Sequence, residues 1–266
     1  MLLMVSVINP EEVPIAIAGG ADILDVKNPG EGSLGAQTPH VLRGVRTITP
    51  DAVKVSAAIG DVPNLPGTVS LAALGAATCG IDYVKVGLYG PKSAEDAVCL
   101  LKAVRQAVEG FPAVRVIAAG YVDAQRAGTL DPRWLPDIAW KAGVSGCLLD
   151  THIKDGCNLF DFLDPGTLAS LAAEAHASGL LFAVAGALQA EHLGQIQEVG
   201  ADIVGVRTAA CRGNRRDGRL DVGKIRVLRK RLGIGEDRGG RRRETGDRGQ
   251  GETGDGGPMT EEDALG

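Results

Sequence analysis

The chain alternates between short apolar runs and longer segments in which apolar and small residues recur at helical spacing. Runs of four to eight apolar residues bounded by glycine or proline predict buried strands, whereas spacings of three and four predict amphipathic helices. The strand-like runs lie at 2–7, 52–59, 113–119 and 180–185. The helix-like segments include 10–18, 68–78, 191–199 and 222–232.

A repeated motif predicts four further strands. Each copy begins with a glycine that can end a helix in the left-handed conformation, and a polar residue then leads into an apolar strand. The copies read GADILDVK (20–27), GIDYVKVG (80–87) and GADIVGVR (200–207), with a looser copy GVSGCLLD (143–150). The two sets together give eight strands, each followed by a helical or loop segment. This alternation predicts an α/β protein with a single (β/α)8 TIM barrel.

The barrel is expected to occupy residues 1–233 as the catalytic domain. An open doubly wound sheet is the alternative, and it fits less well because no glycine-rich dinucleotide fingerprint follows the first strand. Residues 234–266 are rich in glycine and charged side chains and contain no aromatic residue. Such a segment has too little apolar surface to offset its ordering entropy, so we expect a disordered C-terminal tail over 234–266.

Composition excludes several classes of protein. The five cysteines are scattered without a C-x-x-C pair, which is typical of reduced thiols in the cytoplasm. The four histidines share no metal-ligand spacing, so no metal is expected. The chain shows neither a membrane-length apolar run nor the basic start of a signal peptide. Most of the net charge of −5 lies in the tail, and no basic surface with interleaved aromatic residues predicts a nucleic-acid partner.

Ionisable residues gather where the predicted strands end, which is where barrels carry their functional groups. Alignment of the repeats places Asp25 and Lys85 at one inward level and Lys27 and Asp150 at the next, and Lys154 follows on the loop. Desolvation and a neighbouring cation both favour the neutral lysine amine that attacks a carbonyl. The cluster therefore predicts Schiff-base chemistry with general acid–base catalysis. The alternative is an internal network of salt bridges.

The last two strands predict a phosphate site. Gly186 and Gly205 would let backbone N–H groups approach an anion, and Arg207 would add a guanidinium group. For each glycine alone, tight packing is the alternative interpretation. The glycine-rich loop 28–36 could close over a substrate, and Asp61 begins a loop that could face the barrel mouth.

Several long motifs resemble those of one enzyme family. They are AGGADILDVKNPGEGSLGA (18–36), IGDVPNLPGTVSLAALGAA (59–77), DYVKVGLYG (82–90), LLDTHIKDG (148–156) and ADIVGVRTAAC (201–211). In this order they resemble the (5-formylfuran-3-yl)methyl phosphate synthases, also called 4-(hydroxymethyl)-2-furancarboxaldehyde-phosphate synthases. The resemblance runs from the N-terminus to about Leu232 and stops before the tail.

The resemblance implies a class I aldolase-like lyase that joins two molecules of glyceraldehyde 3-phosphate. Loss of phosphate and water would then leave a furan aldehyde phosphate, a precursor of methanofuran, without a cofactor or metal. The family's Schiff-base lysine falls on Lys27, and its other functional positions fall on Asp25, Lys85, Asp150 and Lys154. Thr208 stands where the family pattern leads us to expect a small residue, and we place it with the phosphate site.

Two other classes of function are compatible with the sequence. A phosphosugar isomerase or cyclase barrel would use the lysines only as electrostatic clamps. A non-catalytic sensor of phosphorylated metabolites would bind without turnover and use the tail to contact a partner. The sequence leaves open whether the chain forms a homo-oligomer, in which order the trioses add, and how acid and base roles are divided within the cluster.

Overall fold

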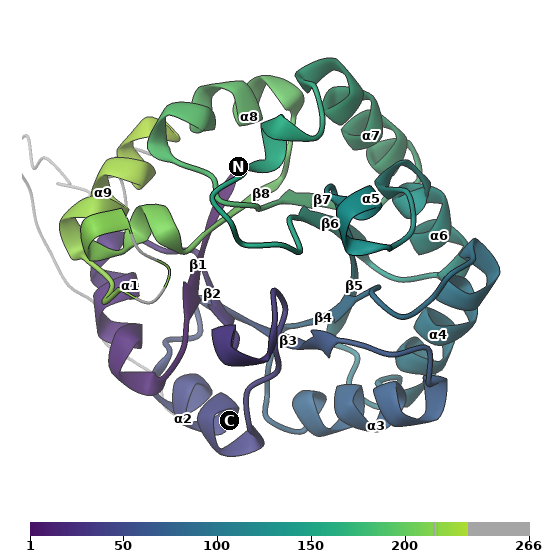
Figure 1. Ribbon diagram of the computed structural model, residues 1–266. Coiled ribbons are helices and arrows are strands. Elements are labelled where there is room, and N and C mark those ends of the chain that lie inside the picture. Colours follow the sequence, from purple (N-terminus) through teal and green to yellow (C-terminus); the bar gives the residue numbers. More distant parts are fainter. Residues whose placement is uncertain (215, 217, 234–266) are drawn as a thin grey trace, which may run out of the picture. The chain divides into compact units, whose positions relative to one another are not determined.

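The computed structural model describes residues 1–214, 216 and 218–233. Eight parallel strands pair in sequence order and close into a barrel, with β1 hydrogen-bonded to both β2 and β8 (Figure 1). This arrangement confirms the predicted (β/α)8 fold, while the predicted tail 234–266 lies outside the described residues. The strands are β1 (Leu2–Val7), β2 (Ile23–Val26), β3 (Lys54–Asp61), β4 (Tyr83–Gly87), β5 (Arg115–Tyr121), β6 (Gly146–Asp150), β7 (Leu181–Val184) and β8 (Ile203–Val206).

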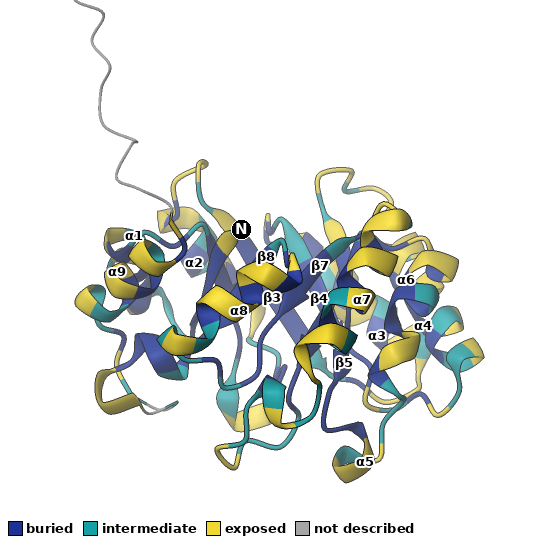
Figure 2. Cartoon of the chain, turned by 90° about the horizontal axis from the view of Figure 1, so that it is seen from above, coloured by how far each residue is buried: buried dark blue, intermediate teal, exposed yellow. Residues whose placement is uncertain are grey.

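Helices surround the barrel and bury one side against the strands. Figure 2 shows the strands in the buried colour and the outward sides of the helices in the exposed colour. The helices are α1 (Val13–Gly19), α2 (Pro39–Ile48), α3 (Pro66–Ala77), α4 (Ala94–Ala107), α5 (Ala124–Ala127), α6 (Leu135–Ala142), α7 (Pro165–Ala177), α8 (Leu193–Val199) and α9 (Val222–Arg231). No helix among the described residues is long and apolar enough to cross a bilayer.

Apolar side chains form two separate clusters, one on each face of the closed sheet. The larger cluster lies between strands and helices and contains residues such as Leu24, Val84 and Leu149. The smaller one fills the barrel interior, with Met4, Ile23, Ile117, Leu148 and Ile203 among its members. Side chains alternate between the two faces along each strand. The inward-facing residues nearest the carboxyl ends of the strands therefore lie at the barrel mouth.

Two strands extend further toward the mouth than predicted. The runs 52–59 and 113–119 were expected to end before Gly60 and Gly120, but β3 reaches Asp61 and β5 reaches Tyr121. Both glycines remain within their strands, and Gly60 does so with a positive φ of 118° beside a register shift between β3 and β4. The extension brings Asp61 to the mouth, where it accepts a hydrogen bond from the hydroxyl of Tyr121.

Gly87 at the end of β4 leaves room for this pair, because a Cβ atom there would collide with the Tyr121 hydroxyl. Tyr121 is fully buried. Burial raises its pKa, and the carboxylate of Asp61 raises it further, so the phenol stays protonated and keeps donating. The ring of His152 lies edge-on to Tyr121 with centroids 5.0 Å apart and stacks on Tyr89 at 4.7 Å.

The glycine-rich loop after β2 fills part of the mouth. Leu34 is fully buried and packs in the interior cluster. Asp61 accepts hydrogen bonds from the backbone N–H groups of Ser33 at 2.8 Å and of Leu34 at 3.3 Å. The hydroxyl of Ser33 donates to the carbonyl oxygen of Thr151 at 2.8 Å. The loop is thus fixed both to β3 and to the loop after β6, and it covers the part of the barrel beneath Leu34.

Candidate active site

A cavity of about 540 Å³ opens at the carboxyl ends of the strands. Its volume lies within the range of small-molecule sites in proteins. The cavity wall includes side chains from β1, β2, β4 and β6 and the segments that follow β6, β7 and β8. Among them are all nine residues selected from the sequence, namely Asp25, Lys27, Lys85, Asp150, Lys154, Gly186, Gly205, Arg207 and Thr208.

The three lysines and two aspartates form one continuous chain of ion pairs. Lys85 Nζ lies 2.5 Å from Asp25 Oδ1, and Lys154 Nζ lies 2.7 Å from Asp150 Oδ1. Lys27 stands between these two pairs, because its Nζ is 3.9 Å from Asp25 Oδ2 and 3.9 Å from Asp150 Oδ2. The order is therefore Lys85–Asp25–Lys27–Asp150–Lys154, with each aspartate shared by two lysines.

Neighbouring groups hold the carboxylates in place. The hydroxyl of Ser6, directly across from Asp25 in the pairing of β1 with β2, donates to Asp25 Oδ2 at 3.2 Å. The backbone N–H of Thr151 donates to Asp150 Oδ1 at 2.8 Å, and Lys154 also donates to the carbonyl oxygen of Thr151 at 2.6 Å. Both carboxylates therefore have fixed directions in the cavity.

Burial and mutual charge set the ionisation of this chain. Burial by itself raises the pKa of Asp25, but the cationic Lys85 and Lys27 more than offset it, so the pKa is lowered. The pKa of Asp150 is likewise lowered, since Lys154 and Lys27 outweigh its burial. The pKa values of Lys85 and Lys154 are lowered mainly by burial, against the opposing charge of the paired aspartate and with a contribution from Lys27. Both carboxylates are therefore anionic at neutral pH.

Lys27 differs from the other two lysines in how it is bound. Lys85 and Lys154 each form a close contact with one carboxylate, whereas the amine of Lys27 has carboxylates only at 3.9 Å. The Lys27 side chain is 9 % exposed and lines the cavity. An amine in this position can leave its ion pairs and reach a bound carbonyl without breaking a short hydrogen bond.

Backbone groups after β7 face the same cavity. Gly186 adopts a positive φ of 108° and Ala187 one of 49°, which turns the chain sharply at the end of the strand. The backbone N–H groups of Gly186 and Ala187 donate to no acceptor within the described part of the chain. A Cβ atom on Gly186 would lie 3.2 Å from Thr151 N, so close packing against the β6 loop also favours glycine here.

The segment after β8 completes this side of the cavity. Thr208 opens a short 3-10 turn (Thr208–Ala210), is partly exposed and lines the cavity. Gly205 faces the barrel interior, where a Cβ atom would lie 2.8 Å from Met4 Cε and 3.2 Å from Ala185 Cβ. Packing of the interior therefore favours a glycine at position 205, in addition to its place beside the cavity.

Arg207 was expected to offer its guanidinium group to a phosphate. In the structure this group donates to acceptors of the protein. Nη1 donates to Glu12 Oε2 at 2.6 Å and to the carbonyl oxygen of Ser6 at 3.0 Å. Nη2 donates to Glu12 Oε1 at 3.0 Å and to Gly218 O at 2.9 Å, and Nε donates to Arg216 O at 3.1 Å. All five N–H donors are thus used by the protein. Arg207 lines the cavity, and its guanidinium group also holds the loop that carries Arg216, so its role as a direct phosphate ligand stays a prediction.

Replacement of Glu12 by glutamine is expected to lower the free energy of unfolding by about 3–5 kcal/mol, because it leaves the buried Arg207 cation without its counter-charge. Urea denaturation at pH 7 measures the change. Glu11, the exposed neighbour, provides the control, and Glu11→Gln should change stability by no more than about 0.5 kcal/mol. Equal effects of the two substitutions would contradict a structural role for the Glu12–Arg207 pair.

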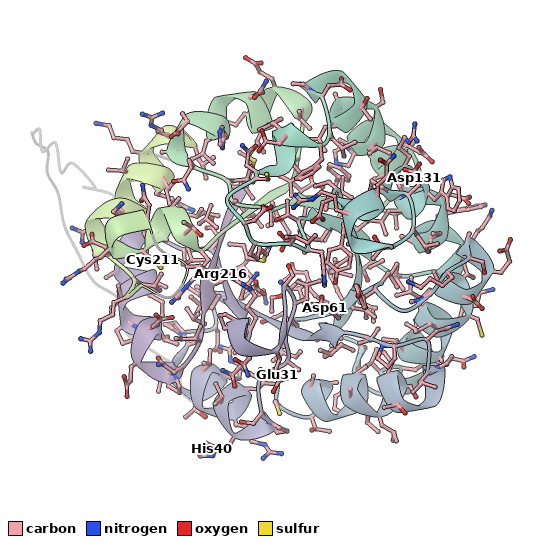
Figure 3. The ribbon with its side chains drawn as sticks, viewed as in Figure 1. Glu31, His40, Asp61, Asp131, Cys211 and Arg216 are labelled. Atoms are coloured by element: carbon pink, nitrogen blue, oxygen red, sulfur yellow. The ribbon has the colours of Figure 1, made fainter. Side chains whose placement is uncertain are left out.

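Two features of the barrel mouth do not follow from local sequence patterns. Arg216 lines the cavity, although nothing in its sequence surroundings distinguishes it from the other arginines after β8. The Tyr121–Asp61 hydrogen bond was also missed, because it depends on the extension of β3 and β5 past two glycines. Figure 3 labels Asp61 and Arg216, which both lie near the centre of the barrel view. Within the described residues, no group of three or more His, Cys, Asp or Glu side chains could hold a metal ion.

A closed barrel with this lysine–aspartate chain at its mouth defines the class, a (β/α)8 protein with a buried ionisable site for a small molecule. The chain belongs to the 4-HFC-P synthase family, whose model matches residues 3–229. The (5-formylfuran-3-yl)methyl phosphate synthase of Methanocaldococcus jannaschii is 52 % identical over 231 residues, which cover 86 % of this chain and 98 % of that protein. The synthase of the same name from Methanothermobacter thermautotrophicus is 50 % identical over 233 residues, covering 87 % and 99 %.

Solved structures show the same fold at low sequence identity. A 3-hexulose-6-phosphate synthase aligns with a TM-score of 0.61 and 18 % identity, covering 87 % of this chain and 100 % of that chain. A phosphoribosyl anthranilate isomerase from Thermus thermophilus aligns with a TM-score of 0.58 and 19 % identity, covering 88 % and 98 %. These similarities establish the barrel, and the family match establishes the relationship by sequence.

Proposed function

We propose that this protein condenses two molecules of glyceraldehyde 3-phosphate to (5-formylfuran-3-yl)methyl phosphate through a Schiff base on Lys27. The observation that carries the proposal is the position of Lys27, loosely held between two ionised aspartates that are each paired tightly with a second lysine. Membership of the 4-HFC-P synthase family supports the choice of product. We further propose that the enzyme is a carbon–oxygen lyase of the cytoplasm and that its product serves methanofuran synthesis.

The first step would form the imine. The neutral amine of Lys27 attacks the carbonyl carbon of one triose phosphate to give a carbinolamine, which loses water once its hydroxyl is protonated. Lys85 and Lys154 are the acids nearest to this centre, and each is linked to Lys27 through one aspartate. Burial lowers the pKa of both lysines, which brings them closer to neutral pH as proton donors.

The second step would join the two trioses. The imine makes the adjacent C–H acidic, and a carboxylate of the chain can accept that proton to leave an enamine. The enamine carbon then attacks the aldehyde of the second triose. Asp150 is well placed to exchange these protons, because it lies 3.9 Å from the nitrogen of Lys27 and 2.7 Å from that of Lys154. We assign assistance of the later eliminations to Lys154, with Asp25 holding Lys85 and Lys27.

The overall reaction balances without an oxidant. Two triose phosphates contain the atoms of one furan aldehyde phosphate, one orthophosphate and two waters. Attack of a hydroxyl group of the second triose on the imine carbon would close the ring, and loss of the amine would return free Lys27. Loss of phosphate and formation of the aromatic ring both favour the products. No step of this scheme therefore calls on a redox cofactor.

Phosphate binding is assigned to the segments after β7 and β8. The backbone N–H groups of Gly186 and Ala187 have no acceptor among the described residues and can donate to phosphate oxygens. The hydroxyl of Thr208 adds a third donor on the same side of the cavity. Gly205 would contribute by leaving this part of the wall without a side chain. Arg207 would also act indirectly, by fixing the backbone of the following loop.

Incubation of the protein with glyceraldehyde 3-phosphate alone tests the proposal. We expect an ultraviolet absorbance typical of a conjugated furan aldehyde to grow together with released orthophosphate, one phosphate for every two trioses consumed. A folded protein that binds the triose phosphate but yields neither signal would contradict the proposal. Interconversion with dihydroxyacetone phosphate, without a chromophore, would move the assignment to a phosphosugar isomerase.

A further inference from the structure

One cation of the cavity wall differs from all the others. Arg216 lines the cavity and is partly buried, and one of its Nη2 hydrogens bonds to the carbonyl oxygen of Gly32 at 2.9 Å. Within residues 1–214, 216 and 218–233, its other N–H donors have no acceptor, and no carboxylate lies within ion-pair distance. A guanidinium group has five donors in a planar fork, and the described residues use only one of those of Arg216.

The other cations of the wall are already matched to anions. Lys85 and Lys154 each have an aspartate within 2.7 Å, and Lys27 lies between the same two carboxylates. Arg207 is saturated by Glu12 and by backbone carbonyl groups. The charges of Asp25 and Asp150 are thus shared among the lysines. Among the described residues, no ion pair joins Arg216 to a carboxylate, and this includes Glu191 of the wall.

The surroundings of Arg216 contain charges of both signs. Burial lowers its pKa, and the charges of Asp150 and Asp61 oppose that effect from a distance without forming a contact. Arg216 in turn contributes to lowering the pKa of Lys154, which places the two cations near each other on one side of the cavity. An anion bound there would relieve both the desolvation of Arg216 and its repulsion from Lys154.

The arrangement fixes Arg216 in this position from two sides. Arg207 Nε donates to the backbone carbonyl oxygen of Arg216, while the guanidinium group reaches the loop after β2 at Gly32. Arg216 therefore bridges the loop after β8 and the loop after β2. The backbone N–H groups of Gly186 and Ala187 belong instead to the turn after β7. The cavity wall thus carries hydrogen-bond donors for an anion at two separate places.

We propose that Arg216 binds a second phosphate group, so that the cavity recognises a branched six-carbon bisphosphate rather than a single triose phosphate. This inference rests on the proposed function, in which the carbon–carbon bond forms before phosphate is lost, so that the adduct of the two trioses carries both phosphates. The turn after β7 holds one phosphate, and Arg216 holds the other. Arg216 is thereby the residue that makes the second substrate a phosphorylated triose and not a free aldehyde.

Binding of unreactive analogues tests the assignment by calorimetry, without turnover. The probes are glycerol 3-phosphate and a pentitol 1,5-bisphosphate, whose phosphates are separated by five carbons as in that adduct. Neither probe has a carbonyl group for Lys27. We expect the wild-type protein to bind the bisphosphate more tightly, and Arg216→Gln to weaken bisphosphate binding on the order of tenfold or more, as for one lost charge-assisted contact. Binding of the monophosphate should change less than about twofold. Arg216→Lys should retain part of the difference.

Arg212→Gln is the matched control, because it removes an arginine of the same loop that pairs with Asp221 and does not line the cavity. It should leave the affinities for both probes unchanged. If Arg216→Gln left the affinities for both probes unchanged, the inference would be overturned. Equal weakening of both probes would also overturn it, since Arg216 would then belong to the first phosphate site. The binding assay needs no reaction. Absence of furan formation by the wild-type protein would therefore reject the proposed function without changing what the binding measurement says about Arg216.

Discussion

Replacement of Lys27 by alanine is expected to lower kcat/KM for furan formation on the order of 10⁴-fold or more, as for loss of the nucleophile in other covalent enzymes. The structural reason is that Lys27 is the amine held at 3.9 Å from both carboxylates, whereas Lys85 and Lys154 are bound at 2.5 Å and 2.7 Å. Steady-state assays of released phosphate and of furan absorbance measure the loss.

Two further variants separate the loss of the nucleophile from the loss of a charge. Lys27→Arg keeps a cation between Asp25 and Asp150 but cannot form an imine, so it should be as inactive as Lys27→Ala while remaining folded. Lys102→Ala removes an exposed lysine and should leave kcat/KM within about twofold of the wild type. If Lys27→Arg kept more than a tenth of the wild-type activity, Lys27 would not be the nucleophile and its role would be electrostatic.

Replacement of Asp25 by asparagine is expected to affect both stability and activity. Asp25 is fully buried and is the closest carboxylate to Lys85, so its loss leaves a buried ammonium group unpaired. The free energy of unfolding at pH 7 should fall by about 3 kcal/mol or more. Loss of the proton link between Lys85 and Lys27 should lower kcat on the order of 10²-fold or more.

The stability cost of Asp25→Asn should depend on pH in a defined direction. Burial lowers the pKa of Lys85 below its ordinary 10.5, and removal of the Asp25 charge removes the main opposing effect. The unfolded chain then binds more protons than the folded protein between the lowered pKa and about 10.5, so stability rises with pH in that window. The free energy of unfolding of Asp25→Asn should therefore fall furthest below that of the wild type near pH 6, and the difference should be smallest near pH 10.

Urea denaturation at several pH values measures this deficit. Asp137→Asn is the matched control, because it breaks an exposed aspartate–lysine pair with Lys141 on α6. Exposed pairs of this kind contribute only about 0.3–0.5 kcal/mol, so the control should show a small effect. A deficit for Asp25→Asn that stays constant from pH 6 to pH 10 would show that Lys85 is not a buried cation that depends on Asp25.

The ionisable core of the site could be predicted because it follows from strand periodicity. Alternation of side chains along a strand places Asp25 and Lys27 on one side of β2, and the repeat aligns Lys85 and Asp150 with them. Parallel strands then bring these ends together without any further information. The repeated Gly–Ala–Asp starts gave the approximate strand positions for the same reason, since they combine a helix end with the entry into a buried strand.

The rest of the site depends on features that no local pattern contains. Glycine normally marks a strand end, so the continuation of β3 to Asp61 and of β5 to Tyr121 was not predicted. The role of Arg207 was assigned from its position at a strand end. Its five donors bond to Glu12 and Ser6, which are far away in the sequence, and to backbone carbonyl groups of the following loop. Arg216 reaches the cavity through a loop whose path cannot be read from residue spacing.

Mass spectrometry of the borohydride-trapped protein tests the central claim most directly. The protein is incubated with glyceraldehyde 3-phosphate, reduced with borohydride, digested and sequenced by fragmentation. The account predicts a stable secondary amine on the nitrogen of Lys27 and an unmodified Lys85 and Lys154. A triose adduct on Lys85 or Lys154, or a wild-type protein that turns over substrate without any reducible adduct, would contradict it.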